Sequence, residues 1–207
     1  AVGDIVRELK KRGLYDNSLI IVTSDHGEEF KEHGYCGHYG LKPYEELIHV
    51  PLVIKFPNGL YGGTIVNDLV CLLDLAPTIV DWLGIDEPKK WMGSSLLPML
   101  KGEKGSKKEG VISESMIKPG HNIVSYRSKR WKLIINEEKG ERELYDLQED
   151  PREMKNLSKI MPERVKKFET EISEHLSRTV GSSKLLPKIP KDQDKRVRER
   201  LKALGYL

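Results

Sequence analysis

The spacing of apolar residues changes between the two halves of this chain. In the first half, the run LIIV at 19–22 is too short for a helix and rich in β-branched residues, which is typical of a strand buried on both faces in a parallel sheet. Apolar residues recur at helical spacing before it, over residues 2–9, and again over 72–83, where Asp74 is the expected cap. A second strand is expected at 50–56. This alternation of helix and strand predicts an α/β fold.

The second half is expected to form a small antiparallel sheet with a packing helix. Its apolar residues alternate in short segments separated by turn residues, a pattern typical of antiparallel strands. In one segment Trp131, Leu133 and Ile135 predict a single core face. Pro162 opens an amphipathic helix. The strands are expected at residues 111–116, 122–127, 131–136 and 142–147.

Composition divides the chain into three parts. Residues 101–110 (KGEKGSKKEG) are polar and rich in glycine, which indicates a boundary between subdomains. We therefore expect the α/β part over residues 1–105 and the antiparallel sheet with its helix over 106–180. Residues 181–207 are expected to be a linker followed by a basic helix.

The balance of charges argues against nucleic acid as a partner. The 207 residues include 35 Lys or Arg and 32 Asp or Glu, for a net charge of only +3. No apolar run is long enough to span a bilayer and no signal-peptide pattern opens the chain, so we expect no membrane partner and favour the cytoplasm. Cys36 and Cys71 imply no disulfide framework. Lys and Glu abound, and Gln148 and Gln193 are the only glutamines, a composition typical of thermophiles.

Candidate chemistry gathers directly after the first strand. Asp25, His26 and Gly27 follow Thr23 and Ser24, where the strand should give way to a loop. In open α/β sheets, ligands bind in the crevice beyond the carboxyl ends of the strands. A carboxylate and an imidazole placed there can both reach one metal ion if Gly27 supplies the backbone freedom to re-aim the second side chain. This pair is therefore a candidate metal site.

Further ionisable side chains follow in the same loop. His33 and His38 each stand beside a glycine, so three of the six histidines fall within thirteen residues. Glu28 and Glu29 could orient an imidazole, although we favour the alternative that they are exposed acids beside a loop. The cluster as a whole could also be a polar loop whose histidines only bond the backbone. Its place at a strand end favours a functional site instead.

The residues around this cluster resemble the sulfatases of the alkaline-phosphatase superfamily. The resemblance starts at TSDHGE and covers nearly the whole chain in order. It implies an alkaline-phosphatase-like α/β fold, of which residues 1–105 are the C-terminal part of the catalytic domain, with the small antiparallel sheet after it. The similar blocks are EHGYCGH, YEELIHVPLVIKFP, LLDLAPTIVDWLGI, GSSLLPMLKGE, WKLIINEEKGERELYDLQEDPREMKNL and LKALGYL.

The resemblance also implies a hydrolase of sulfuric esters that needs a divalent metal ion: Ca²⁺, Mg²⁺ or Mn²⁺. Asp25 and His26 match the late metal ligands of the family. The nucleophile of the family is a formylglycine within a C/S-x-P-x-R motif, and neither that motif nor the early twin Asp occurs in this sequence. The chain thus resembles the C-terminal portion of a sulfatase. Formylglycine is expected only in the missing N-terminal half, and this portion alone is expected to be inactive.

The substrate-side cation departs from the family pattern. Many sulfatases have a lysine where this chain has His38, and Lys42 lies four residues further on as the other candidate. His38 and His33 are the candidates for proton transfer, and His38 and Lys42 for binding the substrate anion. The expected substrate is a sulfate ester, either a small molecule or a glycan. A phosphodiesterase or phosphonate monoester hydrolase of the superfamily, and a non-catalytic half, stay open as alternatives.

The resemblance has one consequence for assembly. A sulfatase would place further strands beside the strand at 18–24, and this chain does not contain them. The exposed edge of that strand offers unpaired backbone groups, which favours self-association.

Overall fold

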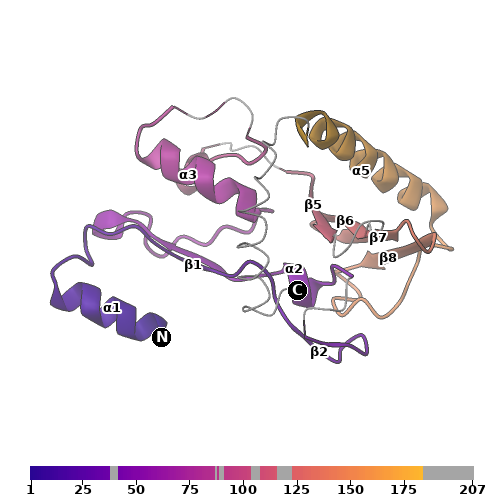
Figure 1. Ribbon diagram of the computed structural model, residues 1–207, viewed down its shortest axis with the longest axis horizontal. Coiled ribbons are helices and arrows are strands. Elements are labelled where there is room, and N and C mark those ends of the chain that lie inside the picture. The colour runs from indigo at the N-terminus through magenta and orange to yellow at the C-terminus, as the bar shows by residue number, and fades with distance from the viewer. Residues whose placement is uncertain (38–41, 87, 89–90, 104–107, 116–122, 184–207) are drawn as a thin grey trace, which may run out of the picture. The chain divides into compact units, whose positions relative to one another are not determined.

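The computed structural model describes residues 1–37, 42–86, 88, 91–103, 108–115 and 123–183. The chain forms two compact units, Ala1–Ile172 and Ser173–Leu207. All strands and all but one of the labelled helices lie wholly in the first unit, while the last helix runs from the first unit into the second (Figure 1). Within the described residues, no helix is both long and apolar enough to cross a membrane.

The first unit opens with a helix and a strand, as predicted. Helix α1 spans Val2–Lys11 and strand β1 spans Ile20–Thr23. Strand β1 pairs in the antiparallel direction with β4, which spans Leu52–Lys55. Its residues are half-buried except for the exposed Thr23. The expectation of a parallel strand buried on both faces is therefore wrong for this pair, because an apolar run reads the same in either strand direction.

A small hairpin and a one-turn helix follow β1, and the sequence pattern did not predict the hairpin. Strands β2 (Glu29–Phe30) and β3 (Cys36–Gly37) pair antiparallel. Helix α2 spans Glu45–Ile48, within the block YEELIHVPLVIKFP. Strands of two residues are too short to show an alternating pattern, so this hairpin had no sequence signal.

Between β4 and the first strand of the second sheet, all the regular elements among the described residues are helical. The predicted helix over 72–83 is present as a 3₁₀ turn, η2, followed directly by helix α3. A further helix, α4, follows. The bounds are Pro57–Gly59 for the 3₁₀ turn η1, Leu72–Asp74 for η2, Leu75–Trp82 for α3 and Leu97–Leu100 for α4.

Asp74 does not cap α3 with its side chain, which corrects the expectation from the sequence. Its carboxylate is fully buried and accepts hydrogen bonds from the backbone N–H groups of Cys71 and Ser94, each at 2.9 Å. Lys108 Nζ donates a third bond, at 2.6 Å. One buried carboxylate thus joins three segments of the chain, which is the kind of full pairing that a buried charge requires.

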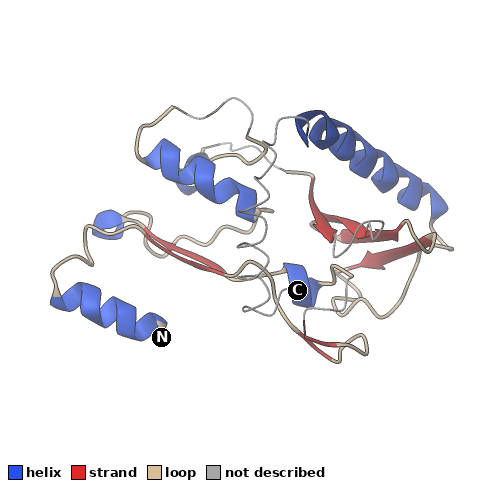
Figure 2. Ribbon diagram, in the orientation of Figure 1, coloured by secondary structure: helices blue, strands red, loops and turns tan. Residues whose placement is uncertain are grey.

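The predicted antiparallel sheet is confirmed, in the order β5-β6-β7-β8 (Figure 2). Helix α5 spans Pro162–Ser183, and its residues Val165, Phe168 and Ile172 are buried, as its amphipathic pattern predicted. The strands span Gly110–Ser115 (β5), Ile123–Ser128 (β6), Trp131–Asn136 (β7) and Glu141–Asp146 (β8).

Both faces of this sheet are buried, so the single core face expected for β7 is wrong. Leu133 and Ile134 point to opposite faces, yet they are 0% and 1% exposed. On one face Tyr126 stacks on Phe168 of α5, with ring centroids 4.8 Å apart. On the other face Ile134 packs in a cluster with Tyr44 of the segment before α2. The second face therefore carries the candidate site region.

Candidate functional site

Asp25 and His26 lie side by side at the end of β1, as their adjacency predicted. Asp25 Oδ2 and His26 Nε2 are 3.9 Å apart, and the Asp25 side chain is 74% exposed. The carbonyl of Gly27 lies 2.8 Å from His26 Nδ1 and can only accept, so in the neutral ring Nδ1 carries the proton. Nε2 then carries the lone pair, at 3.9 Å from Asp25 Oδ2. An imidazole lone pair beside a carboxylate fits one edge of a divalent metal site, which these two side chains would hold.

Local backbone bonds give this loop its shape. Ser24 Oγ donates to the carbonyl of His26 at 2.6 Å, and the N–H of His26 donates to Asp25 Oδ1 at 3.1 Å. The N–H of Gly27 donates to the carbonyl of Leu47 in α2 at 2.9 Å. A backbone hydrogen bond therefore joins the end of this loop to α2.

His33 is held inside the protein, against α2. Its side chain is 9% exposed, and its ring stacks on Tyr44 with centroids 3.6 Å apart and planes inclined by 9°. Its Nε2 lies 3.7 Å from Glu46 Oε1. His38, the other candidate for proton transfer and for binding the substrate anion, lies outside the described residues.

Lys42 is engaged by carboxylates of the antiparallel sheet. Its Nζ donates to Glu143 and lies 3.3 Å from Glu141. Burial alone would lower the pKa of Lys42, but the bonds to these two acids raise it above its ordinary value. Lys42 therefore stays a cation, and in this structure Glu143 already partners its charge.

The most deeply buried charges of the region were not predicted. Lys132 is fully buried on β7, and its Nζ lies 2.8 Å from Glu153 Oε1 and 3.1 Å from Glu45 Oε1. Arg127 Nη2 reaches Glu45 Oε2 at 3.3 Å. Burial would raise the pKa of Glu45, but Lys132 and Arg127 lower it overall. A charged residue among the apolar ones of strand 131–136 was the only sequence signal for this network.

Glu29 corrects a further expectation. It was expected to be an exposed acid, but it is 1% exposed on β2. Burial raises the pKa of its carboxyl, and nearby Glu46 adds to the rise while His33 opposes it. Its partner segments lie elsewhere in the chain, so its burial could not be seen locally.

The α/β part with Asp25 and His26 at a strand end, followed by the antiparallel sheet and its helix, defines a sulfatase-like class with the alkaline-phosphatase-like fold. The chain belongs to the family described as N-sulphoglucosamine sulphohydrolase, C-terminal, whose model matches residues 31–181. The recognition of a C-terminal sulfatase portion from sequence blocks is thereby confirmed, as is the fold class.

Curated relatives agree with this family. The chain is 31% identical over 164 residues to N-acetylglucosamine-6-O-sulfatase of Bacteroides thetaiotaomicron, an alignment that covers 75% of this chain and 29% of that protein. It is 34% identical over 175 residues to arylsulfatase K of Bos taurus, covering 78% of this chain and 31% of that one. The chain thus spans less than a third of the length of these relatives.

Solved structures are similar over most of the chain. One, a protein in complex with its substrate D-glucosamine-2-N,6-O-disulfate, has a TM-score of 0.75 and 27% identity, covering 86% of this chain and 37% of that one. Another, a phosphonate monoester hydrolase of Agrobacterium radiobacter, has a TM-score of 0.72 and 27% identity, covering 86% and 38%. Enzymes for two kinds of ester thus share this architecture.

Proposed function

We propose that this chain is the C-terminal part of a metal-dependent hydrolase of sulfuric esters. The observation that carries the proposal is the family match over residues 31–181, together with sulfatase relatives more than 30% identical. The Asp25 and His26 side chains, 3.9 Å apart at the end of β1, add a carboxylate and an imidazole that suit a metal ion. The nucleophile is not among these residues, since the sequence holds no C/S-x-P-x-R motif.

Each candidate residue has a proposed role. Asp25 and His26 bind the divalent ion, for which Ca²⁺, Mg²⁺ and Mn²⁺ are the candidates. When bound, that ion neutralises the nonbridging oxygens of the ester. His38 and Lys42 bind the substrate anion, and His38 or His33 transfers the proton to the leaving alkoxide. For Lys42 this role requires that the substrate compete with Glu143 for the ammonium group. For His33 it requires that the ring leave its stack on Tyr44.

The proposed substrate class is a sulfated sugar. Both the curated N-acetylglucosamine-6-O-sulfatase and the structure with a glucosamine disulfate act on or bind such molecules, and they are among the relatives of this chain. The second candidate is hydrolysis of phosphonate or phosphodiester bonds. It is favoured by the likeness to phosphonate monoester hydrolases, at the same 27% identity as the glucosamine disulfate structure.

The test is an assay of the natural reading frame with whatever sequence precedes this chain. An upstream twin Asp and C/S-x-P-x-R motif are expected there. The longer protein should hydrolyse an aryl sulfate and a 6-O-sulfated glucosamine faster than an aryl phosphodiester or phosphonate ester, and Asp25→Ala should abolish turnover. The 207-residue chain alone should show no turnover above the metal-only blank.

Two outcomes would contradict the proposal. Preference for the phosphorus ester by the longer protein would favour the second candidate. Turnover by the 207-residue chain that Asp25→Ala abolishes would show that no separate nucleophile half is needed.

A further inference from the structure

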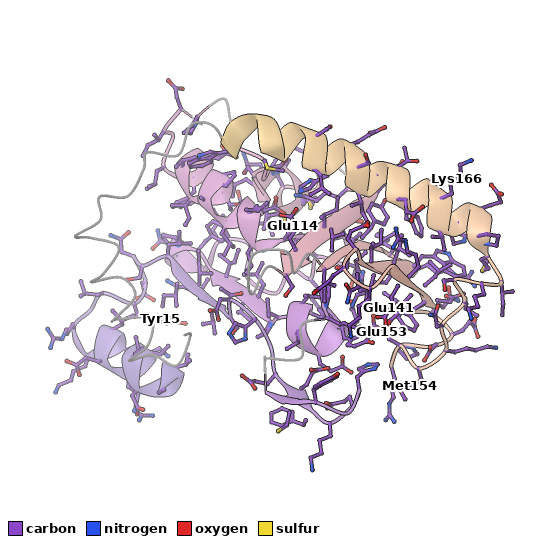
Figure 3. The ribbon with its side chains drawn as sticks, turned by 45° about the vertical axis from the view of Figure 1, so that its right-hand side comes forward. Tyr15, Glu114, Glu141, Glu153, Met154 and Lys166 are labelled. Carbon is purple, nitrogen blue, oxygen red and sulfur yellow. The ribbon has the colours of Figure 1, made fainter. Side chains whose placement is uncertain are left out.

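A second group of metal-ligating side chains lies beneath α2, apart from Asp25 and His26. It consists of Glu29 of β2, His33, Glu46 of α2 and Glu153, which follows β8 and is labelled beside α2 in Figure 3. Glu29 and Glu153 are each 1% exposed, and the His33 side chain is 9% exposed. One nitrogen or oxygen from each of His33, Glu46 and Glu153 lies within 4.8 Å of the other two.

Side-chain atoms in this group lack hydrogen bonds. His33 Nε2, Glu46 Oε2, Glu29 Oε2 and Glu153 Oε1 are all buried and accept or donate none among the described residues. Glu153 Oε1 lies 2.8 Å from Lys132 Nζ, so the ion pair partners this oxygen, and the other three atoms are the unpaired ones. Buried polar atoms are rarely left unpaired, and each such atom costs about 1–3 kcal/mol. A ligand that accepts several lone pairs at once would remove this cost.

Charge points to the nature of that ligand. The two positive charges of Lys132 and Arg127 balance the two carboxylates that they contact, those of Glu45 and Glu153. Two further carboxylates, Glu29 and Glu46, then share a single imidazole, that of His33, so acidic groups outnumber basic ones here. Because charges in a protein interior need compensation, a divalent cation would neutralise this excess.

We propose that His33 Nε2, Glu46 and Glu153 bind a divalent transition metal ion, with Glu29 alongside. One imidazole and two carboxylates suit Zn²⁺ or Mn²⁺. Neighbouring donor atoms of a tetrahedral ion with bonds of about 2.1 Å lie about 3.4 Å apart, so donors as far apart as 4.8 Å have to close by about 1.4 Å. Glu153 then bridges the ion and Lys132, since a carboxylate has several acceptor positions.

The places of His33 and Glu153 in the chain indicate the role of this ion. His33 follows β2 in the loop that begins at Asp25, whereas Glu153 belongs to the turn after β8. The stack on Tyr44 holds the His33 ring in place. Glu153 has φ 55°, in the left-handed region, which is unfavourable for glutamate. Its carboxylate accepts a hydrogen bond from the backbone N–H of Glu45 in α2, and this contact holds the strained residue in place. An ion here ties the candidate catalytic loop to the antiparallel sheet and is structural, and it leaves the proposed proton transfer to His38.

The experiment uses the 207-residue chain freed of metal by chelation, with Asp25→Ala and His26→Ala introduced together to remove the first site. Mn²⁺ binding is followed by electron paramagnetic resonance, and Co²⁺ binding by visible absorption. We expect one ion per chain in this background. Adding Glu46→Gln or His33→Gln should weaken binding by more than about tenfold. Adding Glu163→Gln, which changes an exposed acid of α5, should leave binding unchanged.

Stability without metal gives a second readout. Glu46→Gln removes one of the two carboxylates that share the His33 imidazole, so the metal-free variant should melt at the same temperature as its parent or higher. Added Zn²⁺ or Mn²⁺ should raise the melting temperature of the parent and not of Glu46→Gln. Absence of bound ion in the background protein would overturn the proposal. Destabilisation of the metal-free protein by Glu46→Gln would do so too, because it would mean that a protonated His33 balances Glu46.

Discussion

Gly27 and Glu46 are in backbone contact so close that no other residue fits at position 27. A β-carbon on Gly27 would lie 1.9 Å from the carbonyl oxygen of Glu46. The N–H of Gly27 also donates to the neighbouring carbonyl of Leu47. The φ angle of Gly27 is not in the left-handed region, so the expected need for backbone freedom is wrong. The glycine is required for space, and the contact joins the candidate metal loop to α2.

Gly27→Ala is therefore expected to destabilise the protein by about 1–3 kcal/mol, because the added methyl group forces the loop away from α2. Gly3→Ala is the matched control. Gly3 lies in α1, where a β-carbon would meet only the end of the Arg7 side chain, at an ordinary contact distance of 3.8 Å, and alanine there should stabilise by about 0.5–1 kcal/mol. Denaturation by urea would measure both. Equal stability of Gly27→Ala and the parent would contradict the close contact.

Lys132→Met should be among the most damaging single changes on the sheet. It leaves the buried carboxylates of Glu153 and Glu45 without their shared cation, and breaking a buried pair costs about 3–5 kcal/mol. The control is Lys129→Met, which breaks a partly exposed pair with Asp68 and should cost less than about 1 kcal/mol. Similar losses for the two variants in urea denaturation would show that burial does not decide the effect.

Lys42→Met should change the dependence of stability on pH. Burial would raise the pKa of Glu143, but hydrogen bonds from Lys42, Tyr44 and Tyr145 lower it below its ordinary value of 4.5. The ionised Glu143 carboxylate therefore stabilises the fold above pH 4.5, and this stabilisation is lost as the pH falls through the lowered pKa. The raised pKa of Lys42 means that its contribution is present below 10.5 and fades above it.

The Lys42–Glu143 pair therefore stabilises the fold across the neutral range. Lys42→Met should cost about 1–3 kcal/mol at pH 7 and progressively less below about pH 4. Urea midpoints measured from pH 3 to pH 7 would test this. A loss of stability that stays constant over that range would contradict the assignment.

The abundance of Lys and Glu predicts stability at high temperature. Ion pairs join separate segments, such as Arg142 with Glu169 at 2.7 Å and Arg130 with Asp146 at 2.7 Å. The desolvation cost of such pairs falls as the temperature rises, so they stabilise the fold more at high temperature. We expect a melting temperature above the ordinary range of about 45–65 °C. Calorimetry would measure it, and a midpoint inside that range would count against the prediction.

The isolated chain is expected to associate with itself. Among the described residues, β1 pairs only with β4, which leaves its second edge without a strand partner. Val53 of β4 is 61% exposed, and Ile5 of α1 is equally exposed. Sedimentation velocity should show dimers or larger species that grow with concentration. Val53→Lys should weaken association, and a chain that stays monomeric at high concentration would refute it.

The sequence alone was enough for features that depend on neighbours along the chain. Strand 131–136 was predicted at its observed bounds because alternation and flanking turn residues are local signals. The start of α5 at Pro162 was predicted for the same reason. Asp25 and His26 were expected to lie together because adjacent residues at a strand end cannot lie far apart, and their role as metal ligands stays a prediction. The family followed from ordered sequence blocks.

The tertiary structure decided which charges are buried and what they meet. Glu29 and Lys132 lie more than a hundred residues apart in the sequence, and both are almost fully buried around the same short helix. A charge can be buried only where a distant segment brings its partners, and local periodicity carries no information about that segment. The direction of β1 against β4 was likewise decided in three dimensions, because an apolar run has the same pattern whether its neighbour is parallel or antiparallel.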